Sequence, residues 1–202
     1  MFILKKVTKS YENHLIIDNL FYTFNKDKYC LFGPNGSGKS TLLMLMSGIE
    51  NFDSGSITFN EQTVNSIDVK RKIGVSSDKI LLPDFLTPQQ LLEFHCAEQQ
   101  CVFPTEFITS LNFTHQLSTK VSQLSLGNLK KTSLLLALAH NPLCLILDEP
   151  TTGLDHQSRV WLLDYLDQYQ GQVIVASHEE NFLSNSEYHQ INLLELNAKQ
   201  TC

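Results

Sequence analysis

The stretch of sequence that decides the fold is Gly33-Pro34-Asn35-Gly36-Ser37-Gly38-Lys39-Ser40-Thr41. It fits the pattern G-x-x-x-x-G-K-S/T and lies between a short apolar run, residues 29–32, and apolar residues at helical spacing, residues 42–46. A strand, a glycine-rich loop and a helix in this order point backbone N–H groups and the positive end of a helix at phosphate oxygens. We call residues 33–41 the phosphate loop and expect all of them to bind a nucleotide. Lys39 would contact the β and γ phosphates, and the Ser40 hydroxyl would bind Mg²⁺.

A second apolar run ends in two carboxylates. Leu145-Ile146-Leu147 leads directly into Asp148-Glu149, and the carboxyl ends of parallel strands form the edge at which such sheets bind ligands. We expect Asp148 to hold Mg²⁺ through water and Glu149 to orient or polarise the water that attacks the γ phosphate. Taken alone, the pair has a plainer interpretation, because strands often end in acidic residues that solvate the following turn.

The rest of the chain predicts an α/β fold. Segments rich in β-forming residues occur near the amino terminus, at residues 2–4, 15–17 and 20–24. Uninterrupted apolar runs at residues 143–147 and 173–176 are typical of parallel strands that are buried on both faces. From Thr87-Pro88 onward the apolar residues recur at helical spacing, which predicts a helical insertion before the acidic strand.

Composition narrows the function. Fifteen basic residues against 21 acidic ones give the 202-residue chain a net charge of −6, which disfavours nucleic acid as a partner. The longest uncharged stretch, Thr132 to Leu147, contains Pro142 and is too short to span a bilayer. The residues before Lys5-Lys6 lack the apolar core of a secretory signal. The five scattered cysteines predict free thiols in a reducing compartment, so we expect a cytosolic protein.

Further elements occur in the order of a known family. They are Tyr11 before the phosphate loop, Asp78, Leu124-Ser125-Leu126-Gly127-Asn128 before the acidic strand, Thr152-Gly153-Leu154-Asp155 after it, and Ser177-His178 after the last apolar run. With these elements the chain resembles the ATP-binding subunit of an ABC transporter from residue 2 to about residue 195, most of all the subunits of bacterial multidrug and antibiotic exporters.

That resemblance implies a P-loop NTPase fold with a RecA-like, mostly parallel sheet core and an N-terminal antiparallel β layer. Residues 1–80 and 131–202 would form this core and layer, and residues 81–130 would form a helical subdomain that carries the signature motif. The whole chain, residues 1–202, would be a single ATP-binding domain.

The resemblance also assigns roles to single residues. Tyr11 would stack on adenine, and His178 would donate a hydrogen bond to the γ phosphate. Ser125 and Gly127 would bind the ATP held by a second subunit, so that ATP joins the dimer. Asp155 would belong to the nucleotide site through the family's D-loop. Asp78 stands where the family has the glutamine of its Q-loop, and we expect it to be a further Mg²⁺ ligand.

Two departures from the family pattern stand out. Leu126 replaces the first signature glycine and Asn128 replaces the glutamine, although Ser125 and Gly127 keep the groups that face the phosphate. Asp78 matters more, because a carboxylate cannot donate a hydrogen bond to the attacking water as a glutamine can. We therefore expect ATP binding to persist and the coupling at residue 78 to be altered.

The expected function is that of an ATP-binding and ATP-hydrolysing subunit, with ATP and Mg²⁺, that powers a separate multispanning membrane permease, most simply an exporter. The chain would lie on the cytoplasmic face of the membrane through that permease, which would contact residues 82–92 including Phe85. A second ATP-binding subunit, identical or different, would complete the dimer.

Other functions stay open at this point. They are a nontransport ATPase of the same family, a haem-export subunit, a cassette that binds ATP without turnover, and a soluble P-loop kinase. The kinase is disfavoured because the chain has only two arginines, Arg71 and Arg159, to clamp a phosphorylated substrate.

Overall fold

The computed structural model describes residues 1–12 and 14–198. A parallel sheet of five strands forms its centre, with the spatial order β6-β7-β8-β3-β9. The strands are β3 (Lys28–Phe32), β6 (Ile73–Ser76), β7 (Cys144–Asp148), β8 (Gln172–Ala176) and β9 (His189–Asn192). The fold is therefore the predicted α/β fold, and β7 is buried along its whole length.

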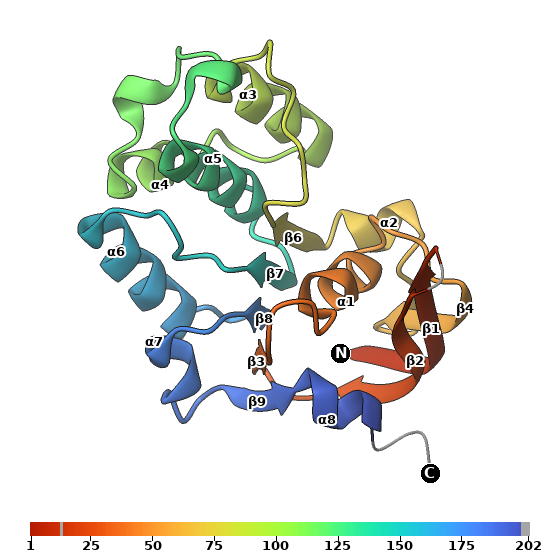
Figure 1. Cartoon of the computed structure of the whole chain (residues 1–202). Coiled ribbons are helices and arrows are strands. Elements are labelled where there is room, and N and C mark those ends of the chain that lie inside the picture. Colours follow the sequence, from red (N-terminus) through yellow and green to blue (C-terminus); the bar gives the residue numbers. More distant parts are fainter. Residues whose placement is uncertain (13, 199–202) are drawn as a thin grey trace.

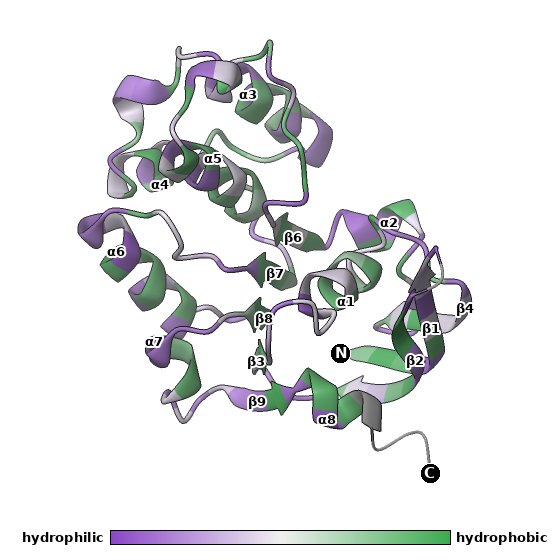
Figure 2. Ribbon diagram, viewed as in Figure 1, coloured by the Kyte–Doolittle hydropathy of each residue, from purple (hydrophilic) through white to green (hydrophobic). Residues whose placement is uncertain are grey.

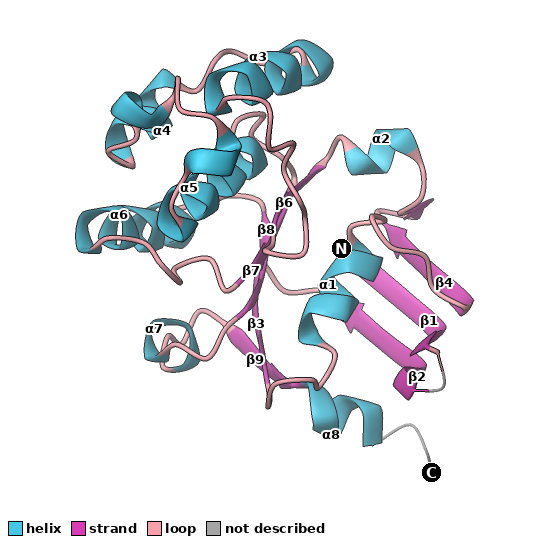
Figure 3. Ribbon diagram, turned by 45° about the horizontal axis from the view of Figure 1, so that its top comes forward, coloured by secondary structure: helices cyan, strands magenta, loops and turns pink. Residues whose placement is uncertain are grey.

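A second, antiparallel sheet is built mainly from the amino-terminal part of the chain. Its order is β2-β1-β4-β5, and the strands are β1 (Phe2–Tyr11), β2 (His14–Phe24), β4 (Ser54–Phe59) and β5 (Gln62–Thr63). Helix α1 (Lys39–Met46) lies between the two sheets (Figures 1 and 3). All of its residues except Ser40 are buried, because both sheets cover it. The phosphate loop is thus attached to the most enclosed helix of the molecule.

Helices cover the other face of the parallel sheet. Helix α5 (Leu126–Leu138) packs on β6, while α6 (His156–Asp167) and α7 (Glu180–Leu183) lie on the same side of the sheet (Figure 3). Helix α6 carries both hydrophilic and hydrophobic residues, whereas the central strands are hydrophobic (Figure 2). Two short helices complete the core region, α2 (Ile67–Lys70) before β6 and α8 (Leu193–Ala198) after β9.

The helical insertion gathers at one end of the molecule (Figure 1). It contains α3 (Pro88–Gln99), α4 (Thr105–Ser110) and two short 3₁₀ helices, η1 (Thr114–Gln116) and η2 (Val121–Gln123). Thr87 and Gln90 form a capping box at the start of α3, with Pro88 in its first turn, as the sequence predicted. The insertion has its own apolar cluster of Leu92, Ile108, Leu111, Phe113 and Leu135. Because Leu135 belongs to α5, that helix anchors the insertion to the core.

The strand register sets the distance between the phosphate loop and Asp148. Leu31 of β3 and Asp148 of β7 both pair with Ala176 of β8, which lies between these two strands. Since neighbouring strands are roughly 5 Å apart, the phosphate loop leaves the sheet about 10 Å from Asp148 and at the same edge. This separation suits a ligand of the size of a polyphosphate.

Two smaller observations complete the fold. None of the helices within residues 1–12 and 14–198 combines the length and the apolar character needed to cross a bilayer. Four of the cysteines predicted to be free, Cys30, Cys96, Cys101 and Cys144, are free thiols, and Cys202 lies outside the described residues.

Candidate nucleotide-binding site

The backbone of the phosphate loop requires its glycines. Gly33, Gly36 and Gly38 have φ angles of +142°, +81° and +95°, a region that residues with a side chain rarely adopt. A Cβ atom on Gly38 would also lie 2.8 Å from Cγ2 of Ile16. The loop therefore curls tightly into the amino-terminal end of α1, where backbone N–H groups have no partner within the helix.

The phosphate loop presents polar groups that can bind an anion. The Lys39 ammonium is almost fully buried and donates to the carbonyls of Gly33 at 2.7 Å and Pro34 at 3.2 Å. The buried Ser37 hydroxyl has no hydrogen-bond partner within the described part of the chain. A buried polar group without a partner costs free energy, so an incoming oxygen atom would be stabilised there. The residues present thus fit a phosphate group.

The loop and the acidic strand meet in one cavity of about 340 Å³. Its lining residues are Ile16, Asn35, Gly36, Gly38, Lys39, Ser40, Thr41, Lys79, Asp148 and Glu149. The structure thus brings together most of the phosphate loop and both predicted carboxylates. It adds Ile16 and Lys79, which the sequence analysis did not single out.

Asp148 is held at the end of β7 by two neighbours. The Ser77 hydroxyl donates to its Oδ2 at 2.9 Å, and the Lys130 ammonium donates to its backbone carbonyl at 3.1 Å. A carboxylate at this position, close to the Ser40 hydroxyl that lines the same cavity, offers the oxygen chemistry that Mg²⁺ prefers.

Glu149 has an unusual backbone. Its φ angle is +44°, which costs a residue with a side chain about 1–2 kcal/mol, and its N–H donates to the Ala176 carbonyl at 2.9 Å. The Ser177 hydroxyl donates to Oε2 at 3.2 Å, and His178 Nε2 lies 3.9 Å from Oε1. The strained turn thus places the Glu149 carboxylate at the cavity and beside His178.

Tyr11 ends β1 close to the phosphate loop. Its side chain is 39% exposed, and the Lys9 ammonium lies 4.9 Å from the ring centroid. Burial raises the pKa of Tyr11, a hydrogen bond with Glu50 raises it further, and a hydrogen bond with Thr41 opposes the rise. Because Thr41 lines the cavity, Tyr11 is a neighbour of the site with a partly accessible ring.

Asp78 is not brought to the cavity. Its carboxylate forms an ion pair with Lys130 on α5, with 2.6 Å between Oδ1 and Nζ, and its side chain is 75% exposed. The next residue, Lys79, lines the cavity instead, with its Nζ 3.4 Å from Oγ1 of Thr41. The expected metal ligand is thus paired with a lysine outside the cavity, and the cation of the next residue lines the cavity instead.

Ser125, Gly127 and Asp155 lie away from this cavity. The Ser125 hydroxyl caps α5 by accepting from the Asn128 N–H at 3.3 Å. A Cβ on Gly127 would lie 2.3 Å from the Gly153 carbonyl oxygen. The signature segment, residues 124–128, and the loop after β7 therefore touch through their backbones. None of these residues lines the cavity of their own chain.

Asp155 stabilises the start of α6 and pairs with a lysine of α5. It caps α6 by accepting from the Ser158 N–H at 3.0 Å, and it forms an ion pair with the buried Lys131. Burial alone would raise the pKa of Asp155, but the hydrogen bond from Lys131, those from Ser158 and the positive charge of Lys131 lower it to about 2. Its carboxylate is fully engaged within the chain.

Comparison with protein families gives a consistent match. The model of the ABC transporter family matches residues 17–152. The Nod factor export ATP-binding protein I of Burkholderia thailandensis is 35% identical over 164 residues, which cover 77% of this chain and 54% of that protein. The linearmycin resistance ATP-binding protein LnrL of Bacillus subtilis is 28% identical over 91% of this chain and 62% of its own length.

A relative that is named for import also matches the chain. The Fe(3+) ions import ATP-binding protein FbpC of Fusobacterium nucleatum is 28% identical over 86% of this chain and 49% of its own length. The chain thus spans about half to two thirds of the length of these curated relatives. Among solved structures, the dimeric ATP-binding cassette MJ0796 bound to ADP and Pi matches with a TM-score of 0.77 and 25% identity, over 90% of this chain and 89% of that one.

Proposed function

The chain belongs to the ABC transporter family, and from this premise we propose that it binds and hydrolyses ATP to power a membrane permease. The observation that carries the proposal is the single cavity in which the phosphate loop, Asp148 and Glu149 meet. Each of these elements alone is compatible with a plain structural role. Their convergence at one edge of a parallel sheet is the arrangement that phosphoryl transfer to water requires.

The residues of the cavity divide the work. Backbone N–H groups of the phosphate loop and the Ser37 hydroxyl would hold phosphate oxygens, and Lys39 would exchange its two loop carbonyls for the β and γ phosphates. The Ser40 hydroxyl and the Asp148 carboxylate would hold Mg²⁺. When bound, this ion neutralises the negative charge that develops on the phosphate oxygens.

Glu149 would orient the attacking water and accept its proton. Its carboxylate is only about a third exposed, and its Oε2 is fixed by the Ser177 hydroxyl, so that Oε1 is left to face the cavity. His178, beside Oε1, would donate to the γ phosphate and so register its presence. Tyr11, next to Thr41, would provide the aromatic face for the adenine ring.

A second subunit would complete the site. Ser125 and Gly127 stand at the amino-terminal end of α5, a helix of 13 residues, yet they do not line their own chain's cavity. The exposed Ser125 and the half-buried Gly127 could thus contact the nucleotide of another subunit, as the dimeric relative supports. Asp155 would shape this surface indirectly, because it fixes the loop after β7 to Lys131 of α5.

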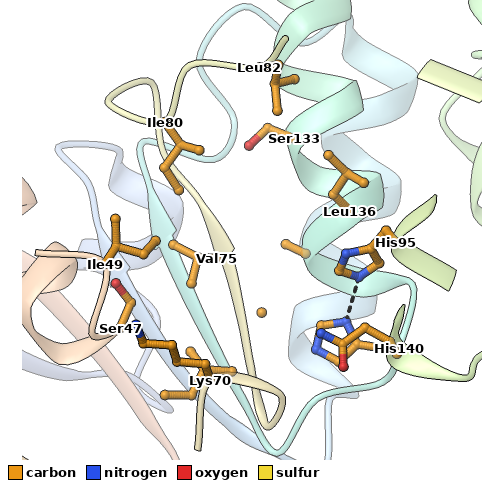
Figure 4. A pocket seen from close by; sticks show the side chains of 14 residues that line it. Ser47, Ile49, Lys70, Val75, Ile80, Leu82, His95, Ser133, Leu136 and His140 are labelled. Carbon is orange, nitrogen blue, oxygen red and sulfur yellow. Dashed lines mark hydrogen bonds between the residues drawn. The ribbon is translucent and has the colours of Figure 1, made fainter. Parts of the chain in front are cut away.

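The permease would dock between the helical insertion and the core. A groove of about 260 Å³ lies there, lined by apolar residues such as Val75, Ile80, Leu82 and Leu136 (Figure 4). The neighbouring Leu81 and Phe85 are 90% and 69% exposed. Exposed apolar side chains beside an apolar groove favour a protein partner. The protein would thus act at the cytoplasmic face of the membrane, and the relatives named for Nod factor export and linearmycin resistance favour an exporter.

Steady-state phosphate release tests the enzymatic part of this proposal. We expect Glu149→Gln to lower the rate at least about 100-fold, because the water then lacks its base. Glu93→Gln is the matched control, since Glu93 is exposed on α3 and its charge is lost in the same way. Equal rates for wild type, Glu149→Gln and Glu93→Gln would refute the assigned role of Glu149.

Recovery of the permease tests the partner. Tagged Glu149→Gln protein with Mg-ATP should retain a multispanning protein from detergent-solubilised membranes, and the additional Phe85→Ala change should reduce that recovery. Phe94→Ala is the control, because Phe94 is also exposed, at 68%, but lies on α3. Recovery of soluble factors alone would favour a nontransport ATPase of the same family.

A further inference from the structure

Lys79 is a charged residue of the nucleotide cavity that belongs to neither the phosphate loop nor the acidic strand. It follows β6, and it lines the cavity together with Lys39, Asp148 and Glu149. Its ammonium lies 3.4 Å from the Thr41 hydroxyl at the start of α1. A long cationic side chain thus reaches from the loop after β6 across to the phosphate loop.

The loop after β6 is fixed in this orientation from both sides. The Ser77 hydroxyl donates to Asp148 Oδ2 at 2.9 Å and accepts from the Lys79 N–H at 3.2 Å. Asp78 is held in the opposite direction by Lys130, whose ammonium also donates to the Asp148 carbonyl. Because one neighbour is anchored outward and the backbone is tied to Asp148, the Lys79 side chain points inward.

The negative charges around the cavity favour a second cation there. Asp148 and Glu149 bring two negative charges to the place where a triphosphate would add more, and Lys39 already serves the loop side. A second ammonium group offsets that repulsion and can donate to a phosphate oxygen, as Lys39 does. Thr41, its present neighbour, is a weak partner for a charged donor, so that a phosphate oxygen would be a stronger acceptor.

We propose that Lys79 is a second phosphate-binding cation of this site, and that it takes the position predicted for Asp78. The inference rests on the proposed function, since it assumes that the cavity receives ATP. The inference goes beyond the proposed function, because the loop after β6 would contribute the Lys79 ammonium to the site and not the predicted Asp78 carboxylate. The contact would be a hydrogen bond between charged partners, worth about a tenfold change in affinity.

Equilibrium binding of ATP, in the Glu149→Gln background to prevent turnover, tests this proposal without relying on activity. Lys79→Met should weaken ATP binding about tenfold, and Lys79→Arg should restore most of the loss, because the positive charge returns. Lys120→Met is the matched control. Lys120 is exposed on the helical insertion and carries the same charge, but it does not line the cavity.

Salt provides a second readout. Lys79 is solvent-exposed, so its attraction for phosphate is screened by ions. The ratio between the affinities of Lys79→Met and its parent should therefore approach one as the salt concentration rises. Equal ATP affinities for Lys79→Met and Lys120→Met at low salt would overturn the proposal. If the parent protein itself bound no ATP, the proposed function would fail instead, so the two failures are distinguishable.

Discussion

Two loops leave the same edge of the parallel sheet, one after β7 and one after β6, and they are held in different ways. After β7, the backbone fixes Glu149 through its positive φ angle and its hydrogen bond to Ala176 of the next strand. After β6, side chains fix the loop, since Ser77 ties it to Asp148 and Lys130 pairs with Asp78. The first loop depends on the sheet, whereas the second depends on a helix that is distant in the sequence.

The difference separates a group that the backbone positions from one that side-chain contacts position. If Glu149 orients water as proposed, it needs a fixed position, and the turn at the end of β7 supplies one. If Lys79 binds phosphate as proposed, its long side chain can tolerate more freedom. Through Lys130, the loop after β6 is tied to α5, the helix that begins next to the signature segment and anchors the helical insertion.

The ion pair between Asp78 and Lys130 should stabilise the loop after β6, so its removal is the first test. We expect Asp78→Ala to destabilise the protein by about 2 kcal/mol, because the buried Lys130 keeps its charge and its bond to the Asp148 carbonyl but loses its partly solvated carboxylate partner. Urea unfolding measures this loss. The double variant Asp78→Ala with Lys130→Met should recover much of it, since an apolar side chain then replaces the unpaired charge. A double variant that is less stable than Asp78→Ala would contradict this account of the loop.

The contact between the signature segment and the loop after β7 offers the next test. Gly127→Ala should cost about 2 kcal/mol, because its Cβ would lie 2.3 Å from the Gly153 carbonyl oxygen and force the two backbones apart. Leu126→Ala is the neighbouring control. Leu126 is 84% exposed, so its truncation should change the stability by less than about 0.5 kcal/mol. Thermal unfolding of both variants is sufficient, and equal melting temperatures would contradict the close approach.

Glu149 itself can show that the strain after β7 belongs to the backbone. Glycine tolerates the φ angle of +44° that alanine does not. We therefore expect Glu149→Gly to be about 1 kcal/mol more stable than Glu149→Ala, although both lack the carboxylate and neither hydrolyses ATP. Equal unfolding free energies would mean that the positive φ angle is not retained in the variants.

The smallest expected effect concerns pH and the groove in Figure 4. There His95 Nε2 lies 3.1 Å from His140 Nδ1, and burial together with the charge of His95 lowers the pKa of His140 to about 4. Between pH 6.5 and pH 4 the unfolded chain therefore binds a proton that the native His140 does not, so that stability falls as the pH falls.

We expect this loss to be about 0.5–1 kcal/mol between pH 7 and pH 5, since the site is partly solvated. Urea unfolding at the two pH values should show a smaller decrease for His140→Gln than for wild type. His115→Gln, a change of an exposed histidine, serves as the control. An identical decrease in wild type and His140→Gln would show that the native His140 is not held neutral.

Sequence patterns predicted those elements whose structure depends on residues close together in the sequence. The phosphate loop follows from its glycines, β7 and β8 from their apolar runs, and the start of α3 from Thr87 and Pro88. Strand β9, His189–Asn192, was not predicted, because its mostly polar residues give no apolar run at the edge of the sheet.

The direction of Asp78 was not predictable in the same way. It depends on Lys130, a residue of α5 that the fold brings to Asp78, and the sequence shows only two adjacent lysines there. The position of Lys79 follows from the same contact. Tertiary contacts thus decided which of two neighbouring residues enters the cavity. Strand register places Asp148, and the backbone turn that follows the strand places Glu149.

The identity of the nucleotide that remains on the protein tests the central claim most directly. Wild type and Glu149→Gln would be incubated with Mg-ATP, separated rapidly from free nucleotide, and their bound nucleotides analysed. If Glu149 orients the attacking water in this cavity, wild type yields ADP and Glu149→Gln retains intact ATP. Conversion of bound ATP to ADP at the same rate in both proteins would contradict the account.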